Sequence, residues 1–321
     1  MSRLPASAVR AVWGVAVILE RYFGNIWDAL RCNTGADQPA MCCNVRVSDS
    51  ENFGGSDVKE RIAECINILG GFLGKRDVSS LTADAIKSKY GIEQADIMVL
   101  FGGSIICGGD VFAEAIRNKI AKKYIIVGGA GHTTETLRKK VHAEFPHIET
   151  DGLTEAEIFQ VYLQTVHGLK ADFLECNSTN CGNNITYLLD LIREKELPFR
   201  SIILIQDAAM QYRMEAGLRK YTADIQIINY VAYRANVVVK NSRLVYKEAI
   251  KGMWDMDRYI TLLMGEIPRL SDNTEGYGPN GKGYIAHVDI PAEVERAFAE
   301  LKEEYGGMVR EANPLYASAC I

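Results

Sequence analysis

The sequence predicts an α/β fold, with a Rossmann-like parallel sheet, helices on both faces, and a helical subdomain from the N- and C-terminal segments. First, short and continuously apolar runs, typical of strands buried on both faces, recur along residues 97–229. Second, stretches with helical spacing of apolar residues separate these runs, and such alternation builds a parallel sheet covered by helices. Third, helical patterns precede and follow this region, which predicts a cap over the sheet.

Two helices are expected before the first strand. Ser56 can cap a helix in which the apolar residues from Val58 to Leu69 keep helical spacing. A second helix is expected over about 82–89. Both precede the sheet and are expected to join the cap.

The strands of the predicted sheet are apolar and end in glycine or polar residues. Runs rich in isoleucine and valine that stop at glycine are typical of buried parallel strands. The expected strands cover residues 97–101, 124–127, 172–175, 201–205 and 224–229.

The intervening helices are predicted from their periodicity and their capping residues. Thr154 and Glu157 form a capping box, which opens a helix that runs to about residue 167. Thr133 or Thr134 can cap a helix that ends near 144, and residues 177–180 offer caps for the next. The expected helices cover about 110–122, 134–144, 154–167, 180–196 and 207–221.

The C-terminal segment has a different character. Residues 244–264 have a helical pattern, and Pro268 is expected to stop that helix. A glycine-rich loop follows at 276–281, and Pro291 begins a last helix that ends near Tyr305.

These patterns predict three segments. Residues 1–50 are expected to form a poorly ordered extension, 51–235 a ligand-binding core, and 236–321 the C-terminal helical subdomain. The apolar stretch from Ala11 to Leu19 is too short to span a bilayer, although a membrane-surface anchor stays an alternative.

Composition excludes some classes of partner. The net charge of −5 argues against nucleic acid as a partner. The eight cysteines form no CxxC pair and no zinc-ligand spacing with histidine, so we expect reduced thiols and no metal. We therefore expect a cytoplasmic protein, with plasma-membrane association as the alternative.

The candidate site lies at the ends of the strands. Ligands of open parallel sheets bind outside the carboxyl ends of the strands, and here every strand end is rich in glycine, amide or hydroxyl groups. Loops of this kind, at one edge of a sheet, predict a shared pocket. The candidate ligand-binding residues are Gly102, Gly103, Ser104, Gly128, Gly129, Gly131, Thr133, Ser178, Asn180, Asn184, Gln206, Met210 and Arg213.

Three residues are candidates for proton transfer: His132, Glu155 and Asp207. Each also has a structural interpretation, because His132 can cap a turn and the two carboxylates can stabilise helix N-termini. A Ser104–His132–Asp207 nucleophile triad is disfavoured, since the chain has no GxSxG motif.

The motifs resemble the YdcF branch of the SanA/ElyC/YdcF family, whose shared domain is a domain of unknown function. The resemblance spans roughly residues 56–305. It rests on the runs 128–134, 177–184, 206–213, 265–270, 275–279 and 287–289.

The resemblance implies a Rossmann-like fold with a helical subdomain, and S-adenosylmethionine as a ligand without an established reaction. Other members of the group are linked to cell-envelope biogenesis and are membrane-anchored. The chain departs from the wider group at Cys181 and Asn183, where threonine and glutamate are usual, so no catalytic carboxylate is carried onto Asn183.

The leading hypothesis is a protein that binds a nucleotide-like small molecule, with S-adenosylmethionine favoured. The glycine signature usual in methyltransferases is missing after the first strand, so binding is expected more than methyl transfer. One alternative is a hydrolase or transferase that acts on a phosphorylated or glycan cell-envelope precursor. Another is a non-catalytic envelope-associated protein.

Overall fold

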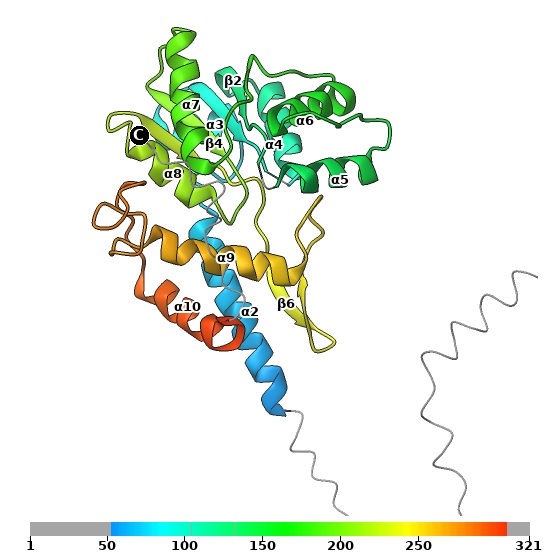
Figure 1. The fold of residues 1–321 in the computed structure, drawn as a ribbon, viewed down its shortest axis with the longest axis vertical. Coiled ribbons are helices and arrows are strands. Elements are labelled where there is room, and N and C mark those ends of the chain that lie inside the picture. Colours follow the sequence, from blue (N-terminus) through cyan, green and yellow to red (C-terminus); the bar gives the residue numbers. More distant parts are fainter. Residues whose placement is uncertain (1–52, 104, 132, 307–321) are drawn as a thin grey trace, which may run out of the picture. The chain divides into compact units, whose positions relative to one another are not determined.

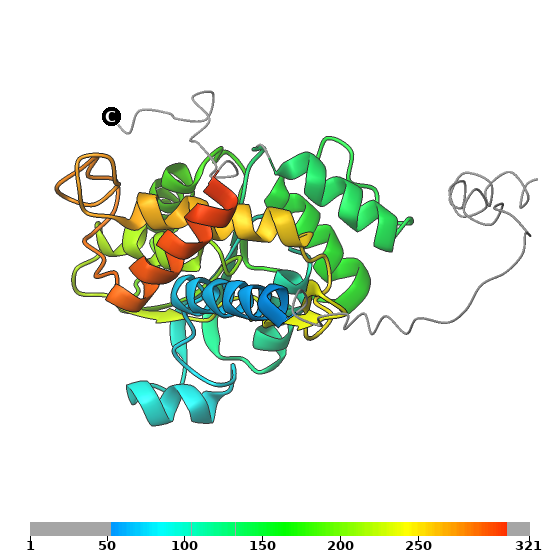
Figure 2. The same ribbon diagram turned by 90° about the horizontal axis from the view of Figure 1, so that it is seen from below.

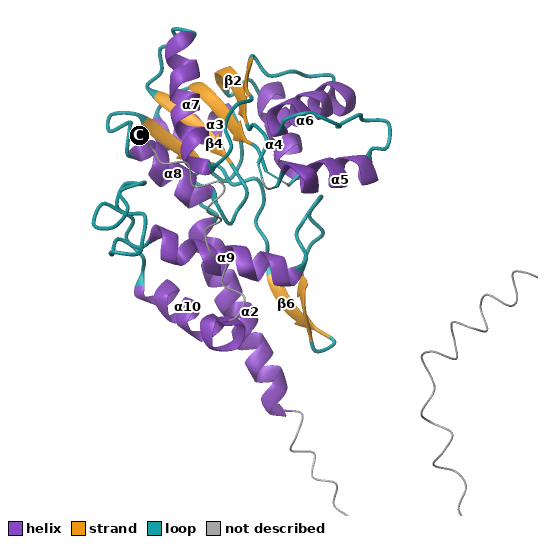
Figure 3. Ribbon diagram, in the orientation of Figure 1, coloured by secondary structure: helices purple, strands orange, loops and turns teal. Residues whose placement is uncertain are grey.

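The computed structural model describes residues 53–103, 105–131 and 133–306. Its centre is a five-stranded sheet in the order β3-β2-β1-β4-β5, in which every pairing is parallel. The strands are β1 (Ala95–Phe101), β2 (Ala121–Val127), β3 (Phe173–Glu175), β4 (Ser201–Ile205) and β5 (Gln226–Asn229). The predicted Rossmann-like α/β class is confirmed (Figure 3).

The chain reverses its direction of travel across the sheet between β1 and β4. From β1 it moves outward through β2 to β3, and then it returns to the other side of β1 as β4 and β5. Loops that leave two adjacent strands in opposite directions open a crevice at their carboxyl ends, which is where such sheets bind ligands.

Alternate residues of each strand face opposite layers of helices. Ile97 and Val99 of β1 pack in one cluster with residues of α7 (Cys181–Glu194) and α8 (Gln211–Arg219). Met98 and Leu100 face a larger cluster on the other side. That side includes buried residues of α3 (Ala83–Tyr90), α4 (Cys107–Arg117), α5 (Thr134–Glu144), α6 (Glu155–Tyr162) and the following π-helical turn η1 (Leu163–His167).

The cap joins the two ends of the described chain. Helix α2 (Phe53–Leu73) contacts both α9 (Met256–Leu270) and α10 (Ala292–Tyr305), and Figures 1 and 2 show α2 and α10 side by side. An antiparallel hairpin, β6 (Val237–Lys240) and β7 (Arg243–Tyr246), also packs on α2.

The predicted helix over 244–264 is wrong in its first half. Residues 237–246 form the β6–β7 hairpin, and its two turn residues, Asn241 and Ser242, have φ values of 50° and 57°. Asn in such a turn between runs of β-branched residues favours a hairpin. The helix itself begins at Met256, where the Asp255 side chain accepts a hydrogen bond from the Arg258 N–H.

Three other boundaries differ from prediction. Pro268 lies inside α9, because a proline so near the end removes one backbone hydrogen bond and the helix continues only to Leu270. Helix α4 ends at Arg117 instead of residue 122, since Lys119 adopts a left-handed φ of 52°. Helix α2 begins at Phe53, so Ser56 lies within it.

The predicted capping box at Thr154 is confirmed. Helix α3 follows Thr82, whose hydroxyl oxygen accepts a hydrogen bond from the Ala85 N–H at 3.3 Å. Within the described residues, no helix is both long enough and apolar enough to cross a membrane. The predicted extension over residues 1–50 lies outside the described residues, and the boundary predicted at 235/236 stays a prediction.

Candidate functional site

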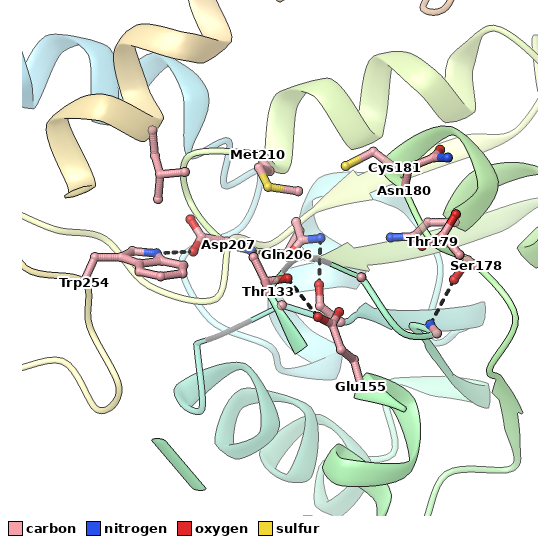
Figure 4. Close-up of a pocket in the computed structure, with 16 residues that line it drawn as sticks. Thr133, Glu155, Ser178, Thr179, Asn180, Cys181, Gln206, Asp207, Met210 and Trp254 are labelled. Atoms are coloured by element: carbon pink, nitrogen blue, oxygen red, sulfur yellow. Dashed lines mark hydrogen bonds between the residues drawn. The ribbon is translucent and has the colours of Figure 1, made fainter. Parts of the chain in front are cut away.

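A cavity lies at the carboxyl ends of the central strands, beneath the cap. Its volume is about 70 Å³, and all the space between its atoms, open solvent included, comes to about 620 Å³. Figure 4 shows Trp254 and Asp207 on one side of the view, with Thr179, Asn180 and Cys181 on the other. The predicted residues that line it are Gly102, Gly103, Gly129, Gly131, Thr133, Glu155, Ser178, Asn180, Asn184, Gln206, Asp207 and Met210.

The other predicted residues lie elsewhere or are not described. Gly128 and Arg213 do not line this cavity. Ser104 and His132 lie outside the described residues, so their roles stay predictions. The prediction missed four lining residues: Thr179, Cys181, Trp254 and Leu262.

The glycines at the strand ends allow loops to pack closely. A Cβ atom on Gly102 would lie 2.6 Å from Glu155 Oε2, and one on Gly128 would lie 2.9 Å from Glu155 Cβ. A Cβ atom on Gly129 would lie only 2.1 Å from the carbonyl oxygen of Ser178. These glycines therefore let the Glu155 side chain and the Ser178 backbone sit against the strand ends.

Glu155 projects from the first turn of α6 into the cavity. Its Oε1 atom accepts hydrogen bonds from the hydroxyls of Thr133 at 2.8 Å and Thr134 at 3.1 Å. Its Oε2 atom has no hydrogen-bond partner among the described residues, although the residue is only 7% exposed. Burial raises the pKa of Glu155, and the two hydroxyls oppose that shift.

Asp207 lies in the same cavity with a different set of contacts. Oδ1 accepts hydrogen bonds from the Ala209 N–H and the Tyr233 hydroxyl, both at 2.9 Å. Oδ2 accepts one from Trp254 Nε1 at 2.8 Å. Burial raises the pKa of Asp207, and these three donors oppose the shift. The carboxylate thus holds the β4 loop, the segment after β5 and the segment before α9 together.

Gln206 and Ser178 fix the loops that form the floor. Gln206 donates to the Gly102 carbonyl at 3.2 Å and accepts from the Asp207 N–H at 2.7 Å. Ser178 Oγ accepts from the Gly129 N–H at 3.2 Å. Both side chains therefore join loops from neighbouring strands.

Helix α7 points its N-terminus at the cavity. Asn180 caps the helix, because its side chain accepts from the Asn183 N–H at 2.9 Å. The remaining N–H groups of the first turn have no partners within the helix. One turn further on, Asn184 lines the cavity while only 9% exposed, and its side-chain amide has no hydrogen-bond partner among the described residues.

Arg213 is buried between α8 and α9. Its guanidinium forms two hydrogen bonds with the Glu266 carboxylate, which also lies 3.6 Å from Arg269. Arg213 thus forms an ion pair with Glu266 that joins α8 to α9. Its predicted role in binding an anionic group of the ligand stays a prediction.

No group of three or more His, Cys, Asp or Glu side chains is placed to hold a metal ion in the described part of the chain. The cavity has two carboxylates in its wall, and none of its described lining residues is lysine or arginine. Such a wall favours ligands with cationic or hydrogen-bond-donating groups.

No family model matches the chain. Among solved structures, it is similar to Escherichia coli tRNA N6-threonylcarbamoyladenosine dehydratase, TcdA, at 15% identity and a TM-score of 0.27. The match covers 46% of this chain and 57% of that one, both for TcdA alone and for its complex with AMP. A further TcdA structure, TcdA (CsdL), matches over 53% of this chain and 56% of its own at the same identity and TM-score. The chain thus spans a little over half the length of these proteins.

Proposed function

We propose that this protein binds a nucleotide-like small molecule in the cavity at the strand ends, with S-adenosylmethionine as the favoured ligand. One observation carries the proposal. Glu155 Oε2 and the Asn184 amide are polar, nearly buried and without hydrogen-bond partners among the described residues, and both belong to one cavity. Both groups open onto the cavity instead of being sealed within the core, so a ligand in the cavity can form hydrogen bonds with them.

S-adenosylmethionine suits the charge of this wall. It carries a sulfonium and an ammonium group, and it has no phosphate that the carboxylates of Glu155 and Asp207 would repel. The apolar side chains of Met210, Trp254 and Leu262 offer contact area for the rest of the molecule. The resemblance to the YdcF branch favours the same ligand.

Calorimetry of the full chain with S-adenosylmethionine, S-adenosylhomocysteine and AMP tests the proposal. We expect S-adenosylmethionine to release heat and AMP to bind more weakly. Asn184→Ala should weaken binding about 10-fold, the loss of one hydrogen bond, while Asn280→Ala in an exposed loop should leave it unchanged. The proposal is wrong if millimolar S-adenosylmethionine releases no heat on mixing and does not shift the unfolding temperature.

A second candidate function is acid–base catalysis, as a hydrolase or transferase on a phosphorylated or glycan envelope precursor. The observation that favours it is the raised pKa of Glu155 together with its free Oε2 atom in the cavity. A buried carboxyl that keeps one oxygen open to the cavity can act as a general acid or base. Asp207 is less suited, because both of its oxygens already accept hydrogen bonds.

A screen of phosphorylated and glycosylated substrates separates this candidate from simple binding. Turnover should disappear in Glu155→Gln and persist in Glu303→Gln, which changes an exposed carboxylate of α10. Turnover that survives in Glu155→Gln would exclude Glu155 as the catalytic group.

A further inference from the structure

The cavity presents hydrogen-bond donors on one helix and a hydrogen-bond acceptor on another. The N-terminus of α7 and the Asn184 amide belong to one helix, while Glu155 belongs to α6. A ligand that bonds with both needs an acceptor or anionic group at α7 and a donor or cationic group at Glu155.

The α7 side is suited to a carboxylate. The helix has 14 residues, so its first-turn N–H groups carry the positive end of a helix dipole. The Asn184 side chain, nine-tenths buried and without a partner among the described residues, adds an amide donor one turn further along the helix. The dipole and the buried amide are independent features that favour the same kind of group.

The Glu155 side is suited to a cation. Its Oε2 atom is free to accept, whereas the oxygens of Asp207 are engaged by Ala209, Tyr233 and Trp254. Among the described lining residues, Glu155 therefore offers a cation a carboxylate oxygen that accepts no hydrogen bond from the protein.

The charged groups around Glu155 do not supply that cation. The charge of Arg138 of α5 lowers the pKa of Glu155, but its guanidinium donates its hydrogen bonds to Glu135 and to the Leu153 carbonyl. Lys140 of α5 donates to the Gly252 carbonyl at 2.6 Å, and its charge lowers the pKa of Asp207. Glu157, on α6, is held by the Thr154 cap.

The volume of the cavity limits the size of the ligand group that it can enclose. An engineered apolar cavity of about 150 Å³ holds one benzene molecule, and the corresponding volume here, about 70 Å³, is about half of that. A purine ring system is larger than benzene, so the enclosed space does not hold a whole nucleoside and part of the ligand extends toward solvent.

We propose that the part of the cavity between α7 and Glu155 binds the α-amino acid end of the ligand, with its carboxylate at the N-terminus of α7 and Asn184 and its ammonium group at Glu155. This inference rests on the proposed function and gives the bound ligand a direction. The amino acid end lies between α7 and Glu155, and the nucleoside end lies toward Trp254, on the opposite side of the view in Figure 4 from the start of α7.

Calorimetry with fragments of the ligand tests the direction. The probes are S-adenosylmethionine, methionine, and 5′-methylthioadenosine, which lacks the amino acid end. We expect methionine to bind and 5′-methylthioadenosine to bind at least 10-fold more weakly than S-adenosylmethionine, the factor that about 1.4 kcal/mol of lost contacts produces.

The outcomes separate the two proposals. If S-adenosylmethionine and 5′-methylthioadenosine bind equally well, the orientation is overturned and the proposed function stands. If methionine binds and S-adenosylmethionine does not, the proposed function fails and the amino acid site stands. If none of the three binds, both are wrong.

Two variants test which residue binds the ammonium group of the ligand and which binds its carboxylate. Glu155→Gln should weaken methionine binding about 10-fold, and it should also remove the rise in wild-type affinity as pH increases above the ordinary glutamate pKa of about 4.3, because only ionised Glu155 pairs with ammonium. Asn184→Ala should weaken methionine more than methioninol, which lacks the carboxylate. Glu303→Gln and Asn280→Ala are the matched controls, and equal losses for both ligands in Asn184→Ala would contradict the assignment.

Discussion

Two buried carboxylates share one cavity, and their surroundings differ. Glu155 uses one oxygen to accept two threonine hydroxyls and leaves the other without a partner among the described residues. Asp207 uses both oxygens, and its three donors come from segments that are distant in the chain. Burial raises the pKa of both groups, so burial alone does not distinguish them.

The number of engaged oxygens does distinguish them. A carboxylate whose acceptors are all filled by protein donors stabilises the fold, and breaking it leaves buried donors without partners. A carboxylate with a free oxygen toward a cavity is available to a ligand. The following predictions test this distinction, from the largest expected effect to the smallest.

Asp207→Ala should lower the free energy of unfolding by about 4 kcal/mol, because Trp254 Nε1, the Tyr233 hydroxyl and the Ala209 N–H lose their acceptor. Urea unfolding measures the loss. The control, Asp190→Ala, removes a solvent-exposed carboxylate paired with Arg193 and should cost less than about 0.5 kcal/mol. Equal stability of the two variants would show that Asp207 does not hold the fold.

Arg213→Met should cost about 3 kcal/mol, because it leaves the Glu266 carboxylate buried without its main partner. Ligand affinity per folded molecule should not change. Adding Glu266→Leu should recover much of the stability. If Arg213→Met instead lowered affinity and left stability unchanged, the anion-binding role predicted from the sequence would be supported.

Gly129→Ala should cost about 2 kcal/mol, because the new Cβ atom would lie 2.1 Å from the Ser178 carbonyl oxygen and the two loops must separate. Thermal unfolding measures it. Gly71→Ala in α2 is the control, because nothing lies within 4 Å of the Cβ atom there and alanine favours a helix. Similar shifts for both variants would argue against close loop packing at Gly129.

Glu155→Gln should change stability by less than about 1 kcal/mol at acidic pH. At higher pH the variant should gain relative to wild type, since a carboxyl whose pKa is raised in the folded state loses stability as pH rises from its unfolded pKa to its folded pKa. Urea unfolding at a series of pH values measures the difference. If instead the wild type becomes more stable relative to Glu155→Gln as the pH rises, folding lowers the pKa of Glu155.

Local patterns predicted the sheet and most of the cavity. Continuous apolar runs predicted the strands within a few residues, and parallel pairing brings their ends to one edge, so Asn184 and Met210 were predicted ligand-binding residues. Glu155 was predicted only as a candidate for proton transfer, and it also lines the cavity. The hairpin was missed, although three valines before Asn241 carried its signal.

The cap's share of the cavity was not predictable from local patterns. Trp254 and Leu262 reach the strand ends only because α9 packs on α2 and α8, and no sequence pattern encodes that placement. The filled oxygens of Asp207 were missed for the same reason, since Tyr233 and Trp254 lie far along the chain.

The pairing of α2 with α10 has a consequence for biosynthesis. The buried face of α2, including Ile66 and Leu69, leaves the ribosome long before Glu300 is available to Arg61, at 2.7 Å in the folded protein. Contacts so distant in sequence form slowly and leave apolar surface open to aggregation in the meantime. Nascent chains that stop short of α10 should therefore depend on chaperones, and those that include it should not.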